Sequence, residues 1–404
     1  MRWIIGLDEA GYGPNLGPFV MSAVAVQVPE GADEASPWSL LQIALCRRAD
    51  HTPGDPRLIV DDSKVTRAVI GKILQEAAPQ VKIVGYAEDG ASALKALDVC
   101  DPDIVILDLA MPSMDGLTAL PLILQKKPRT RIVVCSSSSA PGAEISVRAL
   151  SLGATACVAK PAGTKNPKAI ADFKSALKQA VLGLCDVPLA KLTGETARAA
   201  AAPDLSSFRP KLVAIGSSTG GPNAVISLLK EMGKLPVPVV ITQHMMEMFI
   251  TILARQITQE TGIECIEGSD GLLLEPGRIY LAAGGRHMVL KKSGHRVTIG
   301  LNDGPPENFC KPSVDVMLRS AVEVYGGDIM AVILTGMGKD GLAGSEILAQ
   351  AGGRIVVQDQ ESSIVWGMPG SVANAGLASA ILPVSGLARA VRSTLLDVMP
   401  RGES

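Results

Sequence analysis

Short runs of β-branched and aliphatic residues alternate with longer amphipathic stretches between residues 58 and 185. The stretch after the first run has helical spacing, because apolar residues recur at positions 65, 69, 70, 73 and 74. Strands that alternate with helices are typical of a parallel sheet with crossover helices. We therefore predict a (βα)5 domain over residues 58–185, with its last helix over 166–184. Its strands are expected at Leu58–Val60, Lys82–Val84, Ile104–Leu107, Ile132–Val134 and Ala156–Val158.

A second α/β pattern begins at Lys211 and predicts a second doubly wound, mostly parallel α/β domain over residues 211–400. Residues 186–210 contain an alanine run and no sustained apolar period, which indicates a linker. Residues 1–57 hold one hairpin-like pair of apolar runs, too little for a core of their own. Strands of the second domain are expected at 212–215, 237–242, 279–282, 331–334 and 355–357.

The composition agrees with two or three globular domains, because 404 residues exceed the size of one hydrophobic core. Hydrophobic residues make up 47% of the chain, and the net charge of −2 gives no basic field that would attract nucleic acid. The seven cysteines form no Cys-x-x-Cys pair, which argues against a disulfide framework and favours a reducing cytoplasm. Apolar runs fall short of the roughly 20 residues that span a bilayer. We therefore expect a cytoplasmic protein with no membrane insertion and no nucleic-acid partner.

Polar side chains follow four of the five predicted strands of the first domain, at the edge where ligands bind to parallel sheets. Asp61 and Asp62 follow the first strand and Asp108 follows the third. Converging carboxylates need a hard cation, so these three side chains predict a Mg²⁺ site. Ser136 and Lys160, after the fourth and fifth strands, would contact a phosphoryl group carried by Asp108. The alternative is that each aspartate only caps the following helix.

The second domain has the sequence Gly-x-Ser-x-Gly where its first strand meets a helix, which makes Ser218 a candidate nucleophile. A glycine-rich phosphate loop is the alternative for this motif alone. His244 follows the next strand, and Asp340 lies in a glycine-rich loop after the run 330–334. Three such residues at one sheet edge favour a Ser-His-Asp triad. Their order along the chain differs from the Ser, Asp, His order of α/β-hydrolases, which disfavours that fold.

Residues 57–184 resemble a response-regulator receiver domain. The resemblance implies that Asp108 is the phosphoacceptor, that Asp61, Asp62 and Asp108 hold Mg²⁺, and that Ser136 and Lys160 form the switch pair. Cys157 stands where receivers usually carry an aromatic residue, which questions aromatic-coupled switching but not phosphorylation. The motifs are Leu58–Ser63, Val105–Asp108, Met111–Gly116 and Lys160–Pro161.

Residues 211–391 resemble the catalytic domain of the chemotaxis protein-glutamate methylesterases, the CheB family. The resemblance implies that Ser218 is the nucleophile, His244 the general base and Asp340 its orienting acid. The backbone N–H groups of Thr219 and Met337 would hold the oxyanion. The motifs are Ser217–Gly221, Gln243–Met245, Gly285–Met288, Pro312–Val316, Gly336–Gly341 and Gly367–Gly370.

The implied reaction is hydrolysis of γ-glutamyl methyl esters on chemoreceptor helices, which releases methanol, together with deamidation of glutamine side chains. The esterase step would need no cofactor. A chemotaxis histidine kinase would phosphorylate the receiver, which is expected to act as a lid over the triad. Met246 and Glu247 stand where the family usually has two prolines, so the local loop is expected to differ. The alternative function is a non-enzymatic two-component signalling adaptor with a vestigial triad.

The first residues, Ile4–Pro14, resemble the opening of a type 2 ribonuclease H. Asp8 and Glu9 would be metal ligands in such a nuclease, which needs further carboxylates from later strands. The chain becomes a receiver before it supplies them. We therefore expect residues 1–57 to be a non-functional fragment.

Overall fold

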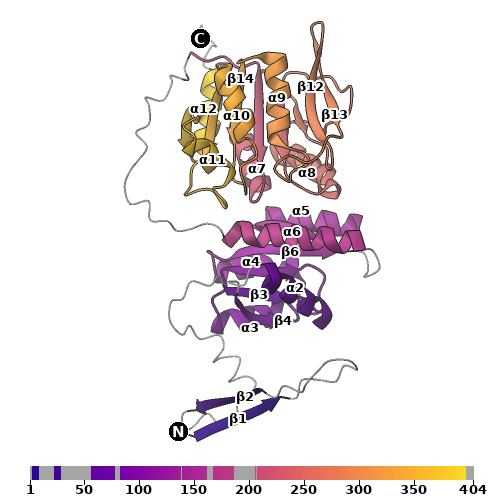
Figure 1. Ribbon diagram of the computed structural model, residues 1–404, viewed down its shortest axis with the longest axis vertical. Helices are drawn as coiled ribbons and strands as arrows, with labels where there is room; N and C mark the ends of the chain where they lie inside the picture. The colour runs from indigo at the N-terminus through magenta and orange to yellow at the C-terminus, as the bar shows by residue number, and fades with distance from the viewer. Residues whose placement is uncertain are drawn as a thin grey trace.

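The computed structural model describes residues 2–8, 22–28, 56–77, 82–137, 139–161, 167–185, 205 and 207–396 (Figure 1). Strands β1 (Arg2–Asp8) and β2 (Ser22–Val28) pair antiparallel, as the hairpin-like pattern predicts. Glu9 and most of the predicted linker lie outside the described residues. The predicted domain boundaries therefore stay predictions.

The first α/β domain is a parallel five-stranded sheet with the order β4-β3-β5-β6-β7, which confirms the predicted (βα)5 fold. The central strand β5 is buried along its whole length, because helices cover both of its faces. The strands are β3 (Pro56–Val60), β4 (Lys82–Ala87), β5 (Ile104–Asp108), β6 (Arg131–Ser137) and β7 (Ala156–Lys160). The helices are α2 (Lys64–Ala77), α3 (Gly90–Val99), α4 (Gly116–Lys126), α5 (Ala140–Ser151) and α6 (Pro167–Cys185).

The second domain is built on a seven-stranded sheet with the order β10-β11-β9-β8-β14-β15-β16, and every neighbouring pair in it is parallel. An antiparallel hairpin, β12 (His287–Ser293) with β13 (Arg296–Asn302), is added to it. The sheet strands are β8 (Leu212–Ser217), β9 (Val239–Gln243), β10 (Cys265–Glu267), β11 (Ile279–Leu281), β14 (Ile329–Ile333), β15 (Arg354–Gln358) and β16 (Ala380–Leu382). The helices are α7 (Gly221–Met232), α8 (Glu247–Thr261), α9 (Val314–Tyr325), α10 (Leu342–Gln350), α11 (Met368–Asn374) and α12 (Val384–Leu396).

Alternate residues of each strand enter two separate cores, one on each face of the sheet. Val213 and Ile215 of β8 pack with α7, α8 and α12. Leu212 and Ala214 of the same strand pack with α9, α10, α11 and the hairpin. Strands buried on both faces must be apolar at nearly every position, which explains the continuous apolar runs of the sequence.

The order of the strands places the topological switch point beside β8. The chain leaves β8 for β9 on one side and later returns to β14 on the other. Ligand crevices of doubly wound sheets open at such a point, beyond the carboxyl ends of the strands. Ser218, His244 and Asp340 follow β8, β9 and β14, so the fold brings all three loops to this crevice.

Helix α5 of the first domain lies between its own sheet and the second domain (Figure 1). Ala143, Val147 and Ala159 of the first domain form one buried cluster with Phe249 of α8. The amide of Asn223 donates to the carbonyl of Leu150 at 2.7 Å. The two domains are therefore packed together through an apolar patch with polar contacts around it. Among the helices that the structure describes, none is long and apolar enough to cross a membrane.

Candidate active site and phosphorylation site

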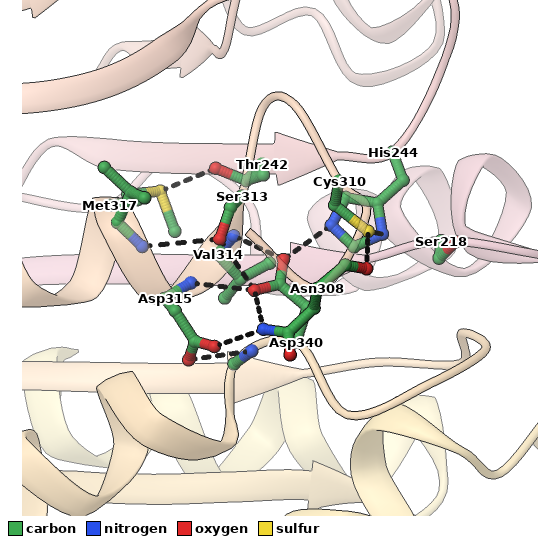
Figure 2. Close-up of polar contacts among 12 residues, drawn as sticks. Ser218, Thr242, His244, Asn308, Cys310, Ser313, Val314, Asp315, Met317 and Asp340 are labelled. Carbon is green, nitrogen blue, oxygen red and sulfur yellow. Dashed lines mark hydrogen bonds and ion pairs between the residues drawn. The ribbon is translucent and has the colours of Figure 1, made fainter. Parts of the chain in front are cut away.

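His244 and Asp340 form the centre of the site in the second domain (Figure 2). The His244 Nε2 atom lies 2.7 Å from Asp340 Oδ2. Asp340 is 1% exposed, and the His244 side chain is 12% exposed. Because Nε2 is occupied by the carboxylate, the other ring nitrogen, Nδ1, is the one available to a reacting group.

The N-terminus of α9 holds the Asp340 carboxylate in place. Oδ2 accepts a hydrogen bond from the backbone N–H of Val314 at 2.7 Å. Oδ1 accepts from the Ser313 hydroxyl at 2.7 Å and from the backbone N–H of Asp315 at 3.2 Å. The free N–H groups and the dipole at a helix start stabilise a negative charge. The contacts at the start of α9 therefore fix the orientation of the Asp340 carboxylate and stabilise its ionised form.

The pKa values follow from these contacts. Burial alone would raise the pKa of Asp340, but hydrogen bonds from His244, Ser313 and Val314 outweigh it and hold the pKa well below its usual range. Burial would lower the pKa of His244, but its hydrogen bonds with Asp340 and Cys310 raise the pKa to about 9. The site therefore favours the imidazolium form, which is the form that a general base reaches during catalysis.

Asp315 forms a second buried carboxylate behind Asp340. Its Oδ1 accepts hydrogen bonds from the backbone N–H groups of Gly341 at 3.0 Å and Gly344 at 2.7 Å. Burial and the neighbouring charge of Asp340 raise the pKa of Asp315 to about 6. Asp315 thus fixes the loop that carries Asp340. It does so without a contact to His244 in the described structure.

Ser218 lies on the side of the His244 ring that is opposite to Asp340 (Figure 2). Gln243 joins the two strand ends, because its amide donates to the carbonyls of Ser218 at 2.9 Å and His244 at 3.0 Å. Within the described residues, no hydrogen bond joins Ser218 Oγ to His244. Catalytic hydrogen bonds of this kind often tighten only in the substrate complex.

Two backbone N–H groups close to Ser218 have no hydrogen-bond partner among the described residues. They belong to Thr219 and Met337. Thr219 is positioned by its carbonyl, which accepts a hydrogen bond from the Thr335 hydroxyl at 2.9 Å. Unpaired N–H groups that flank a nucleophile can stabilise a developing oxyanion.

Cys310 occupies the available nitrogen of His244. Its Sγ atom lies 3.5 Å from His244 Nδ1 and 3.4 Å from the carbonyl oxygen of Asn308. Sulfur forms only weak hydrogen bonds, so an incoming hydroxyl can displace the Cys310 side chain from Nδ1. No spacing or chemical pattern in the sequence indicated a role for Cys310, Asn308, Ser313 or Gln243. The only sequence signal was that Ser313 and Gln243 lie inside motifs shared with the CheB family.

The first domain gathers the predicted acidic residues at the carboxyl edge of its sheet. Ligand atoms of Asp61, Asp62 and Asp108 lie within 4.8 Å of one another. The Lys160 ammonium lies 2.6 Å from Asp61 Oδ2 and 2.7 Å from Asp108 Oδ2. Burial raises the pKa of Asp108, and the positive charge of Lys160 opposes that shift. Three oxygen donors at one edge fit Mg²⁺, which binds through a few carboxylates and keeps several waters.

Ser136 is buried near the end of β6, but its hydroxyl forms a hydrogen bond with the hydroxyl of Ser146 in α5. Ser146 also donates to the carbonyl of Gly142 at 2.7 Å. The described structure therefore turns Ser136 toward the helix that contacts the second domain. Its predicted contact with a phosphoryl group on Asp108 stays a prediction.

Comparison with known proteins gives two family matches. Residues 58–171 match the response regulator receiver domain, and residues 213–391 match the CheB methylesterase. Neither match covers residues 1–57, so the comparisons do not support the resemblance of that segment to a ribonuclease H.

Relatives resemble the chain along most of its length. A protein-glutamate methylesterase/protein-glutamine glutaminase of Rhodopseudomonas palustris is 41% identical over 353 residues, covering 81% of this chain and 91% of that protein. One of Rhodospirillum rubrum is 39% identical over 378 residues, covering 86% of this chain and 97% of that protein. The solved Thermotoga maritima CheB methylesterase catalytic domain is 35% identical, with a TM-score of 0.45, over 46% of this chain and all of that one. The 41% and 39% identity to the two relatives, over 81% and 86% of this chain, shows that the chain belongs to the CheB family of protein-glutamate methylesterases.

Proposed function

We propose that this protein is a phosphorylation-regulated protein-glutamate methylesterase and protein-glutamine glutaminase that acts on chemoreceptors. The observation that carries the proposal is the His244–Asp340 pair, held at the switch point of the sheet beside Ser218. The substrates are γ-glutamyl methyl esters, with methanol as the product, and glutamine side chains, with ammonia as the product. A chemotaxis histidine kinase is the phosphodonor for Asp108.

In the esterase step, Ser218 Oγ attacks the γ-carbonyl carbon and its proton passes to His244 Nδ1. The N–H groups of Thr219 and Met337 stabilise the resulting oxyanion. Collapse of this intermediate breaks the bond to the methoxy group, and His244 returns the proton to release methanol. Water then attacks the acyl-enzyme with His244 again as base, which regenerates Ser218 and leaves glutamate. Asp340 stabilises the imidazolium in both halves of the reaction.

The receiver acts as a lid in its unphosphorylated state. The backbone N–H of Gly220, two residues after Ser218, donates to the carbonyl of Thr155 in the receiver at 3.2 Å. Val365 belongs to a buried cluster whose other members all come from the receiver, and Met337 packs against it. Contacts on both sides of the nucleophile support a docked receiver that restricts access of a protein substrate.

Phosphorylation of Asp108 would open the lid through α5. Asp61, Asp62 and Asp108 would hold Mg²⁺, which neutralises charge on the phosphoryl oxygens when it is bound. Lys160 already contacts Asp108, and Ser136 would turn from Ser146 toward the phosphoryl group. That turn removes a buried hydrogen bond from the helix that packs on α8, which shifts the population toward the open arrangement.

The alternative of a non-enzymatic adaptor is not favoured, because relatives with the same two domains carry esterase and glutaminase names. A serine-directed fluorophosphonate probe separates the two functions. We expect labelling of the wild type at Ser218, and no labelling or methanol release from methylated receptor membranes by Ser218→Ala. A wild type that is neither labelled nor active with phosphodonor present would support the adaptor instead.

A further inference from the structure

Phe309 is presented to solvent at the tip of a turn beside the active site. Its side chain is 93% exposed, whereas Phe173 and Phe249 are 6% and 1% exposed. The backbone of Asn308 and Phe309 is left-handed, with φ values of 50° and 64°. Such a conformation is unfavourable for a bulky residue, and an exposed ring adds nothing to the core. Neither the exposure of the Phe309 ring nor its left-handed backbone stabilises the folded protein.

The turn that carries Phe309 is fixed to the catalytic machinery. The backbones of Glu307 and Cys310 exchange hydrogen bonds of 3.1 and 2.7 Å. The Asn308 amide donates to Asp315 at 2.9 Å and to Asp340 at 3.3 Å. Because the turn is held at several points, the position of Phe309 relative to Asp340 is set by the fold. Left-handed residues of this kind persist only where the surroundings impose them, and they gather at functional sites.

Phe309 also directly precedes, in the chain, a residue that contacts His244, the proposed base. The next residue, Cys310, lies 3.5 Å from His244 Nδ1, the atom that takes the proton from Ser218 in the proposed reaction. The exposure of 93% applies to the arrangement with the receiver docked. A substrate surface can therefore reach this ring before the lid opens.

We propose that Phe309 is a substrate-anchoring residue that binds an apolar side chain of the receptor helix, three or four residues from the esterified glutamate. Residues at this spacing lie side by side on one face of a helix, so a ring one residue along the chain from the thiol that contacts the base is placed to meet the neighbour of the reacting side chain. The inference rests on the proposed function and names the surface feature that its substrate must carry. It assigns binding to Phe309 and leaves the chemical step to the triad.

The test compares a receptor substrate with a small ester, the γ-methyl ester of N-acetylglutamate. We expect Phe309→Ala to raise the KM for methylated receptor membranes about tenfold, because a partly buried aromatic contact is lost. The kcat for receptor, and all constants for the small ester, should stay within twofold. Phe309→Leu should restore most of the affinity. The matched control is Ile381→Ala, an exposed apolar side chain on β16, which should change nothing.

A further arm repeats the measurement with and without phosphodonor, and the KM effect should be the same in both. An unchanged receptor KM in Phe309→Ala would overturn the proposal, as would an equal loss with the small ester, which would indicate a distorted site. An effect seen only with phosphodonor would show that the ring is not available before opening. Wild type that hydrolyses neither substrate would instead overturn the proposed function itself.

Discussion

Replacement of Asp340 by asparagine tests how the site controls its base. The two hydrogen bonds to His244 raise its pKa from 6.5 to about 9. This rise in the pKa corresponds to about 3.4 kcal/mol of preference for the imidazolium form, and the hydrogen bond with Asp340 is its largest single source. Loss of this preference in the transition state would lower kcat by up to about 300-fold.

The amide adds a second penalty, because both carboxylate oxygens of Asp340 accept hydrogen bonds. Oδ2 faces Val314 N–H and His244, and Oδ1 faces the Ser313 hydroxyl, so the NH2 group must meet donors in either orientation. A buried donor without an acceptor costs about 1–3 kcal/mol. If the NH2 group faces His244, it also enforces the tautomer with Nδ1–H, which cannot take a proton from Ser218.

The assay is the pH dependence of kcat/KM for a small γ-methyl ester. In the wild type, kcat/KM should rise with pH up to an inflection near 9, because His244 must lose its proton to act as base. In Asp340→Asn the inflection should move down toward the ordinary pKa of about 6.5 while the plateau falls. The control is Asp315→Asn, which removes a buried carboxylate that does not contact His244 and should keep the inflection. An inflection that stays near 9 in Asp340→Asn would show that Asp340 does not set the pKa of His244.

Three further predictions concern the lid and the stability of the site. Asn223→Ala removes one hydrogen bond between the domains, worth about 0.5–1.5 kcal/mol, and should raise methanol release without phosphodonor about two- to tenfold. Ser146→Ala removes the partner of Ser136 in α5 before any phosphorylation, so it should raise methanol release without phosphodonor about two- to tenfold and reduce the further activation by phosphodonor by a similar factor. The raised pKa of His244 contributes stability below about pH 6.5 that is lost as pH rises through about 9, so urea unfolding should show this loss in wild type and not in His244→Gln. In each case, a variant that behaves like the wild type would contradict the role assigned to the group that was replaced.

The sequence was sufficient to predict both sheets, because strands buried on two faces appear as continuous apolar runs. It also placed Ser218, His244 and Asp340 at strand ends, and the parallel sheet then brought these ends together. The short edge strands β10 and β16 and the β12–β13 hairpin were not predicted. β10 ends in Glu267 and β16 is followed at once by Pro383, so neither forms a sustained apolar run, and Lys291 and Lys292 interrupt the apolar run of β12.

The contacts that surround the proposed triad could not be predicted from local patterns. Ser313 lies 27 positions before Asp340, and only the packing of α9 against the β14 loop brings them together. Likewise, Cys310 reaches His244 across 66 positions, and its spacing in the sequence carries no metal or thiol motif. The docking of α5 on α8 depends on shape and area of two surfaces, which hydrophobic periodicity does not encode.

The most direct test of the account measures methanol release from methylated receptor membranes by wild type and Asp108→Asn, each with Mg²⁺ and with or without a small acyl phosphate as phosphodonor. The account predicts low release by both proteins alone, a strong rise for wild type with phosphodonor, and no rise for Asp108→Asn. Equal release by the two proteins with phosphodonor would contradict control of the triad by the receiver.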